Sequence, residues 1–256
     1  MSVIKLDGYN LSLEDLIKVS RFNHKVELTE NAVERIKKSR AIVDDLVENE
    51  KVSYGITTGF GKFSDVVISK KDTHKLQINL IRSHACGVGN PLSEEIVRAM
   101  MLLRINALSK GYSGIRLETL QILIDMLNKG VHPIVPEKGS LGSSGDLAPL
   151  SHMVLTMIGE GEAIYKGEKM SSRDALEKAG IKPLEYLSSK EGLSLNNGTQ
   201  CMTAIGAITA YDAINLMKTA DIALGLTMEG LNGITCAMDE RVNLVRPHKG
   251  QFNTAK

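Results

Sequence analysis

Residues 139–150 of this chain are GSLGSSGDLAPL, a glycine- and serine-rich stretch that stands directly before a predicted helix. Asp146 is a favourable N-cap residue, Pro149 suits a first helical turn, and apolar residues follow with helical spacing at positions 150, 153, 154 and 157. Groups held at this point face the positive end of the helix dipole. The stretch therefore predicts a tight turn before a helix, at a place that favours developing negative charge.

The triplet Ser143-Ser144-Gly145 has a composition from which a chain can build its own electrophile. If the Gly145 nitrogen attacks the carbonyl carbon of Ser143, a five-membered ring closes. Loss of one water from the ring and of a second with the Ser144 hydroxyl leaves a methylidene conjugated to a carbonyl. Gly145 suits this step because a side chain would crowd the attacking nitrogen and restrict the turn. The alternative interpretation is a plain turn that caps a helix.

Five segments of the chain, in order, resemble the aromatic amino acid lyase family. They are YGITTGFG at 54–61, SHACGVG at 83–89, the triplet with DLAPL at 143–150, LNNGTQ at 195–200 and RPHKGQ at 246–251. The Ser83-His84 pair is similar to the family members that act on histidine rather than on phenylalanine. The chain departs from the family pattern at Ser143, Thr57 and Asn196, where Ala, Asn and Leu are usual.

The resemblance implies a reaction and a set of site residues. It implies 4-methylidene-imidazol-5-one formed from the triplet, with Ser144 as the methylidene source, and conversion of L-histidine to urocanate and ammonia. Tyr54 would remove the substrate's β-proton, which requires a lowered pKa because an ordinary tyrosine titrates near pH ~10. His84 would select histidine, and Asn197 would hydrogen-bond the ring carbonyl or the substrate carboxylate. Phenylalanine or tyrosine ammonia-lyases and aminomutases share this machinery and remain alternatives.

The length of the chain gives a second hypothesis. Family members are considerably longer, so the resemblance implies that residues 1–256 are the N-terminal portion and that a helical C-terminal half lies outside this chain. That half would supply another tyrosine, an arginine and a glutamate, and the family implies a homotetramer. The chain would then be a half-subunit that is inactive without a complementary C-terminal chain. Residues 253–256 agree with this idea, since they predict a cap and the first turn of a further helix.

Composition excludes several other classes of protein. A net charge of +1 and 4% aromatic residues argue against a nucleic-acid partner, and we expect no membrane segment and a cytoplasmic location. The cysteines at 86, 201 and 236 form neither a disulfide framework nor a zinc pattern, so we expect no metal. A phosphate-binding loop at 55–62 fails, because Ile56 and Phe63 stand where the pattern needs glycine and Ser or Thr.

The remaining sequence predicts a mainly α fold, a helical bundle with a small amount of β structure near the N-terminus and around residues 162–169. Residues 201–217 are apolar or small on every face, which is typical of a helix buried in a large assembly. We therefore expect the chain to form part of a larger oligomeric helical assembly. We predict one helix that begins at Ser12 and further helices over 30–48, 93–109, 117–128, 146–159 and 171–180, with Gly130 closing the helix over 117–128. A short strand or turn falls within 2–9, and a small hairpin covers 162–169.

Overall fold

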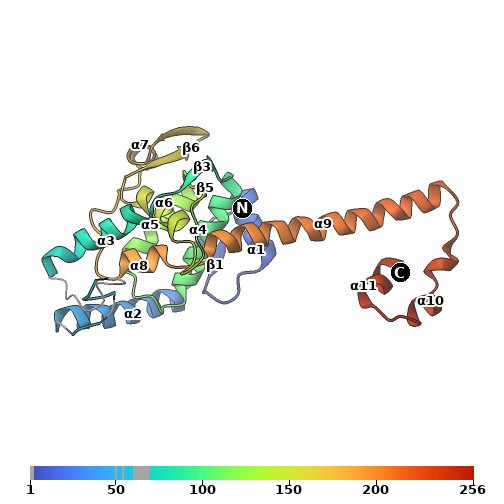
Figure 1. The fold of residues 1–256 in the computed structure, drawn as a ribbon, viewed down its shortest axis with the longest axis horizontal. Coiled ribbons are helices and arrows are strands. Elements are labelled where there is room, and N and C mark those ends of the chain that lie inside the picture. The colour runs from blue at the N-terminus through green and yellow to red at the C-terminus, as the bar shows by residue number, and fades with distance from the viewer. Residues whose placement is uncertain (1–2, 50, 54, 60–69) are drawn as a thin grey trace. The chain divides into compact units, whose positions relative to one another are not determined.

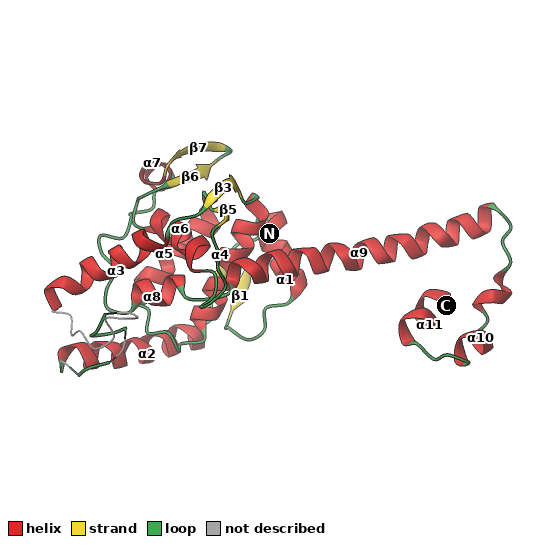
Figure 2. Ribbon diagram, viewed as in Figure 1, coloured by secondary structure: helices red, strands yellow, loops and turns green. Residues whose placement is uncertain are grey.

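The structure, a computed structural model, describes residues 3–49, 51–53, 55–59 and 70–256. Most of these residues are helical, and the strands are few and short (Figure 2). The mainly α fold with small amounts of β structure is therefore confirmed. The chain divides into two units, Met1–Ala207 and Ile208–Lys256, and the helix Gln200–Gly230 (α9) begins in the first and continues into the second.

The first unit is organised around α4 (Glu94–Ser109; Figure 1). Its apolar residues are buried or half-buried. Met100, Met101, Leu102 and Ile105 of α4 are completely buried, because the helix contacts α1, α2 and α5. The helices that begin in this unit are α1 (Leu13–Phe22), α2 (Glu30–Glu48), α3 (Lys70–His84), α4 (Glu94–Ser109), α5 (Leu117–Lys129), α6 (Leu147–Met157), α7 (Ser172–Lys178), α8 (Glu191–Asn196) and α9.

Three small sheets connect these helices. β1 (Ile4–Leu6) pairs in parallel with β2 (Val26–Leu28), and β3 (Val88–Pro91) pairs antiparallel with β5 (Pro136–Lys138). The predicted hairpin is confirmed as β6 (Glu162–Tyr165) and β7 (Glu168–Ser171), and β4 (Val131–Pro133) adds a third antiparallel strand beside β6. The β3–β5 pair places the end of the 83–89 segment beside the strand that leads into the 139–150 stretch.

Local capping signals were accurate guides to where helices begin. The Ser12 and Ser171 hydroxyls accept hydrogen bonds from the backbone N–H groups three residues later, at the starts of α1 and α7. The predicted helices at 30–48 and 93–109 match α2 and α4 almost residue for residue. Gly130, in the left-handed conformation with φ +75°, ends α5 as predicted.

The second unit contains the rest of α9 and three short helices, η2 (Thr235–Met238), α10 (Glu240–Leu244) and α11 (Lys249–Ala255). The expectation for residues 253–256 was wrong, because residues 253–255 are the end of α11 and not the start of a helix. The α9 helix is longer than predicted, and Ile214, Leu216 and Met217 on it are 48–69% exposed in this chain. Among the described residues, no helix has both the length and the apolar character needed to cross a membrane.

Candidate functional site

The serine- and glycine-rich loop, residues 139–146, lies between β5 and α6, and both ends of it are firmly held. β5 pairs with β3, and a Cβ atom placed on Gly139 would lie only 2.9 Å from the Gly87 Cα atom. At the other end, Leu150, Met153 and Val154 of α6 are completely buried, as the sequence predicted. A loop anchored in this way presents its few residues in one defined position.

Gly145 is packed directly against the turn that contains Gly198. Gly145 has φ +96°, and a Cβ atom there would overlap the Gly198 carbonyl oxygen. That same oxygen accepts a hydrogen bond of 2.6 Å from the Asp146 N–H. The absence of a side chain at position 145 therefore allows two loops, more than fifty residues apart in sequence, to touch through their backbones.

Ser144 and Asn197 are brought together by the same contact. The Ser144 hydroxyl donates to the Asn197 Oδ1 atom at 3.4 Å, and both residues are exposed to solvent. Ser143 is exposed as well. The triplet and the amide that sequence reasoning paired with it thus share one accessible surface.

Asp146 occupies the predicted N-cap position of α6, but the prediction that it caps this helix was wrong. Its carboxylate makes no hydrogen bond to α6 and accepts instead from Ser140 Oγ at 2.8 Å and from Met202 N at 2.9 Å. The reason lies in the backbone: the capping residue Ser12 is extended with ψ 164°, whereas Asp146 has ψ 55°. Asp146 therefore ties the loop to the first turn of α9, and the loop lies at the N-termini of two helices.

His84 is the last residue of α3 and is half-buried. Its Nδ1 atom lies 2.8 Å from the Leu80 carbonyl oxygen, which can only accept, so Nδ1 carries the proton in the neutral ring. Nε2 is then the acceptor nitrogen that the ring can offer to a ligand. The hydrogen bonds of His84 are to Leu80 and Ser83, within its own helix, and not to the loop.

His152 on α6 links the His84 segment to the loop, a connection that sequence reasoning missed. Its Nε2 atom accepts a hydrogen bond of 3.0 Å from Gly87 N, and burial lowers the pKa of His152, which favours the neutral acceptor form. The two residues are 65 positions apart, so no local sequence pattern announces the contact. Through Gly87, the segment after His84 is attached to α6, the helix that directly follows the loop with the triplet.

The other predicted positions have local explanations or lie outside the described residues. Tyr54, the predicted base, is outside them. Thr57 accepts from Ser53 N at 2.9 Å and donates to the Lys51 carbonyl at 2.7 Å, so it stabilises its own turn. The buried Asn196 donates to Ser151 Oγ at 3.2 Å, on α6. Thr57, a departure from the family pattern, thus stabilises its own turn, whereas Asn196, another departure, joins α8 to α6 across 45 positions.

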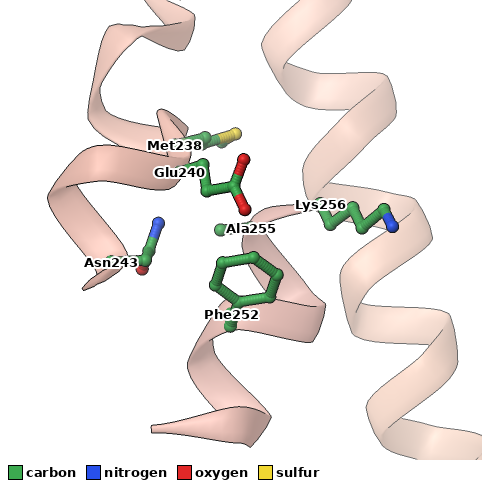
Figure 3. Close-up of a pocket in the computed structure, with 6 residues that line it drawn as sticks. All are labelled: Met238, Glu240, Asn243, Phe252, Ala255 and Lys256. Carbon is green, nitrogen blue, oxygen red and sulfur yellow. The ribbon is translucent and has the colours of Figure 1, made fainter. Parts of the chain in front are cut away.

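The described residues hold no cluster of three or more His, Cys, Asp or Glu side chains suited to a metal. A cavity in the second unit contains none of the predicted site residues, and Figure 3 shows the Phe252 ring beside the Glu240 carboxylate in it. It is lined by Met238, Glu240, Asn243, Phe252, Ala255 and Lys256.

Comparison with known proteins defines the class. A family model described as aromatic amino acid lyase matches residues 11–256, and the chain therefore belongs to that family. It is 66% identical to the histidine ammonia-lyase of Alkaliphilus oremlandii over 256 residues, which are all of this chain and 50% of that protein. The chain spans about half the length of the curated relatives it matches.

Solved structures agree with this assignment. The histidine ammonia-lyase of Trypanosoma cruzi superposes with a TM-score of 0.93 at 39% identity, covering 99% of this chain and 50% of that one. The phenylalanine aminomutase of Pantoea agglomerans reaches a TM-score of 0.91, also at 39% identity, and covers 100% of this chain and 49% of that one. The fold is therefore shared by a histidine ammonia-lyase and a phenylalanine aminomutase.

Proposed function

We propose that this chain is the N-terminal, cofactor-forming portion of a histidine ammonia-lyase, a carbon–nitrogen lyase that converts L-histidine to urocanate and ammonia. The observation that carries the proposal is the packing of Gly145 against the Gly198 carbonyl, with Ser144 hydrogen-bonded to Asn197. The high identity to curated histidine ammonia-lyases supports the choice of substrate.

The triplet fits the formation of 4-methylidene-imidazol-5-one. The new bond joins the Gly145 nitrogen to the Ser143 carbonyl carbon, whose oxygen leaves as the first water. The second water takes the Ser144 hydroxyl and the hydrogen on its Cα atom. The missing side chain at Gly145 leaves the attacking nitrogen uncrowded. The helix N-termini beside the loop stabilise negative charge that develops there.

The mature group would supply an electrophile that makes the substrate amine a better leaving group. Three side chains of this chain have separate roles in the rest of the reaction. Tyr54 removes the β-proton, His84 offers Nε2 to the imidazole or ammonium region of histidine, and Asn197 exchanges its bond with Ser144 for one to the ring carbonyl or the substrate carboxylate. No metal or nucleotide enters this scheme.

The remaining active-site groups would come from another polypeptide segment. We propose that a helical C-terminal half supplies the remaining groups and that the complete enzyme works in the cytoplasm as a homo-oligomer, a tetramer in the family pattern. The exposed apolar residues of α9 support an assembly that covers them.

The test is the intact mass of the purified chain, produced alone and together with the C-terminal half of a close relative. A deficit of two waters in the peptide that contains residues 143–145, with histidine turnover in the combined sample, is the expected result. A combined sample that has neither the deficit nor turnover would overturn the proposal. Turnover of phenylalanine or tyrosine in place of histidine would favour the alternative of a phenylalanine or tyrosine ammonia-lyase or aminomutase; the Pantoea agglomerans structure represents an aminomutase.

A further inference from the structure

Arg104 is a buried arginine in the middle of α4, and it lies directly beneath the turn that contains Gly198. The residue is 5% exposed. One of its terminal nitrogens donates to Gln200 Oε1 at 2.9 Å, and the other donates to the Ser194 carbonyl oxygen. A Cβ atom on Gly198 would overlap both the guanidinium group and the Gln200 side chain. The turn therefore packs directly against the guanidinium group of Arg104.

The hydrogen-bonding partners of Arg104 are unusual for a buried cation. Both are neutral oxygens, one on each side of the turn, and the Nε atom is buried with no partner among the described residues. Burial lowers the pKa of Arg104 to about 10, so the group still carries its charge at neutral pH. Burying a charge without a carboxylate partner is costly, so the contacts that such a group makes must offset that cost.

Arg98, two turns earlier on α4, provides a matched comparison. It is also a buried arginine that donates to backbone carbonyls, those of Val19 and Leu127. These carbonyls belong to α1 and α5, so Arg98 joins three helices of the core. Arg104 makes the same kind of contact, but to the ends of the segment that faces the triplet.

We propose that Arg104 is a positioning residue that holds the Asn197–Gly198 turn against the cofactor-forming loop. Its two donors bind on either side of the turn, at residues 194 and 200. This turn supplies the Gly198 carbonyl oxygen, which accepts from Asp146 N, and the Asn197 amide oxygen, which accepts from the Ser144 hydroxyl. A planar guanidinium binds two acceptors at once in a fixed geometry, whereas a lysine ammonium is a compact point charge on a flexible stem. The link to maturation of the triplet rests on the function proposed above.

The experiment compares the complete chain, with its complementary half, as wild type and as Arg104→Met, Arg104→Lys and Arg98→Met. Hydrogen exchange is followed in peptides covering residues 144–150 and 194–202, and the intact mass gives the fraction of matured triplet. We expect Arg104→Met to speed exchange of the Asp146 amide about tenfold and to lower that fraction, with Arg104→Lys in between. Arg98→Met should lower the melting temperature and leave both local readouts near wild type.

Two outcomes would overturn the proposal. One is unchanged exchange at 144–150 in Arg104→Met, and the other is the same local change in Arg98→Met, which would mean general loosening of the core. If Arg104→Met does not fold, Gln200→Met decides, since it removes one of the two contacts at a partly exposed position and should speed the same amides. If the wild type lacks the mass deficit, the proposed function fails, while hydrogen exchange still decides the role of Arg104.

Discussion

The contact between Gly145 and Gly198 makes a quantitative prediction for Gly145→Ala. The new methyl group would stand where the Gly198 carbonyl oxygen lies, at a backbone φ of +96°. The chain must respond by moving the two loops apart. Such a movement breaks the 2.6 Å bond from Asp146 N and separates Ser144 from Asn197.

The magnitude follows from these two effects. Holding a residue with a side chain at this positive φ costs about 1–2 kcal/mol. Loss of the backbone hydrogen bond adds about 1 kcal/mol. The free energy of unfolding of the first unit should therefore fall by about 2–3 kcal/mol, which for a unit of this size lowers the melting temperature by about 4–12 °C. We also expect the two-water mass deficit to disappear.

Gly142→Ala is the matched control. Gly142 lies in the same loop with φ +79°, but nothing lies within 4 Å of its missing Cβ atom. The Gly142→Ala variant should lose only the free energy needed to hold alanine at positive φ, about 1–2 kcal/mol, and it should keep the two-water mass deficit. Calorimetry and intact-mass spectrometry of both variants test the argument. Equal melting temperatures for the two variants, or a fully matured triplet in Gly145→Ala, would refute the claim that contact with residue 198 shapes the loop.

Three further predictions concern buried charges and thiols. Glu191 is completely buried and accepts two bonds from the Arg116 side chain, so Glu191→Ala should lower the free energy of unfolding by about 3–5 kcal/mol in urea titrations, a loss that Glu191→Gln should reduce. Burial and the nearby Arg98 charge lower the pKa of His132 from 6.5 to about 4. The neutral ring therefore contributes about 3 kcal/mol to the free energy of unfolding, a contribution that is complete above pH 6.5 and lost as the pH falls through 4. The variant His132→Gln should flatten this part of the plot of stability against pH. Burial raises the pKa of the Cys201 thiol to about 11, so iodoacetamide at pH ~8 should label the two exposed cysteines and spare this one in a peptide map, and equal labelling would contradict the burial.

The sequence predicted best those features that depend on neighbouring residues. The hydroxyls of Ser12 and Ser171 cap the helices that directly follow them, and a positive-φ glycine at 130 ends the helix before it. Each of these interactions spans only a few residues, so pattern and propensity determine it. The same holds for the β6–β7 hairpin, whose turn contains Gly167 at φ +82°.

Contacts between distant segments were harder to predict from the sequence. The Asp146 carboxylate was expected to cap its own helix and instead binds the start of α9, 56 residues away, because of the backbone angle at that residue. The helix α3 was missed because most of its residues are polar and its apolar stripe is weak. For the site, family motifs indicated Ser144 and Asn197 and the structure joins them, whereas Arg104 and His152 act across the fold, where no spacing rule applies.

The separation of the loop from its partner also sets an order of events during synthesis. The triplet leaves the ribosome before the residues that define its shape, since the Ser144–Asn197 and Asp146–Met202 bonds span 53 and 56 positions. At about 5–20 residues per second, this interval lasts about 3–11 s. During it, Gly145 has no carbonyl to pack against and the loop samples many conformations. If the triplet matures as proposed above, the contacts that shape it form only after residues 197–202 have been synthesised, and we expect the nascent chain to carry an unreacted serine until then.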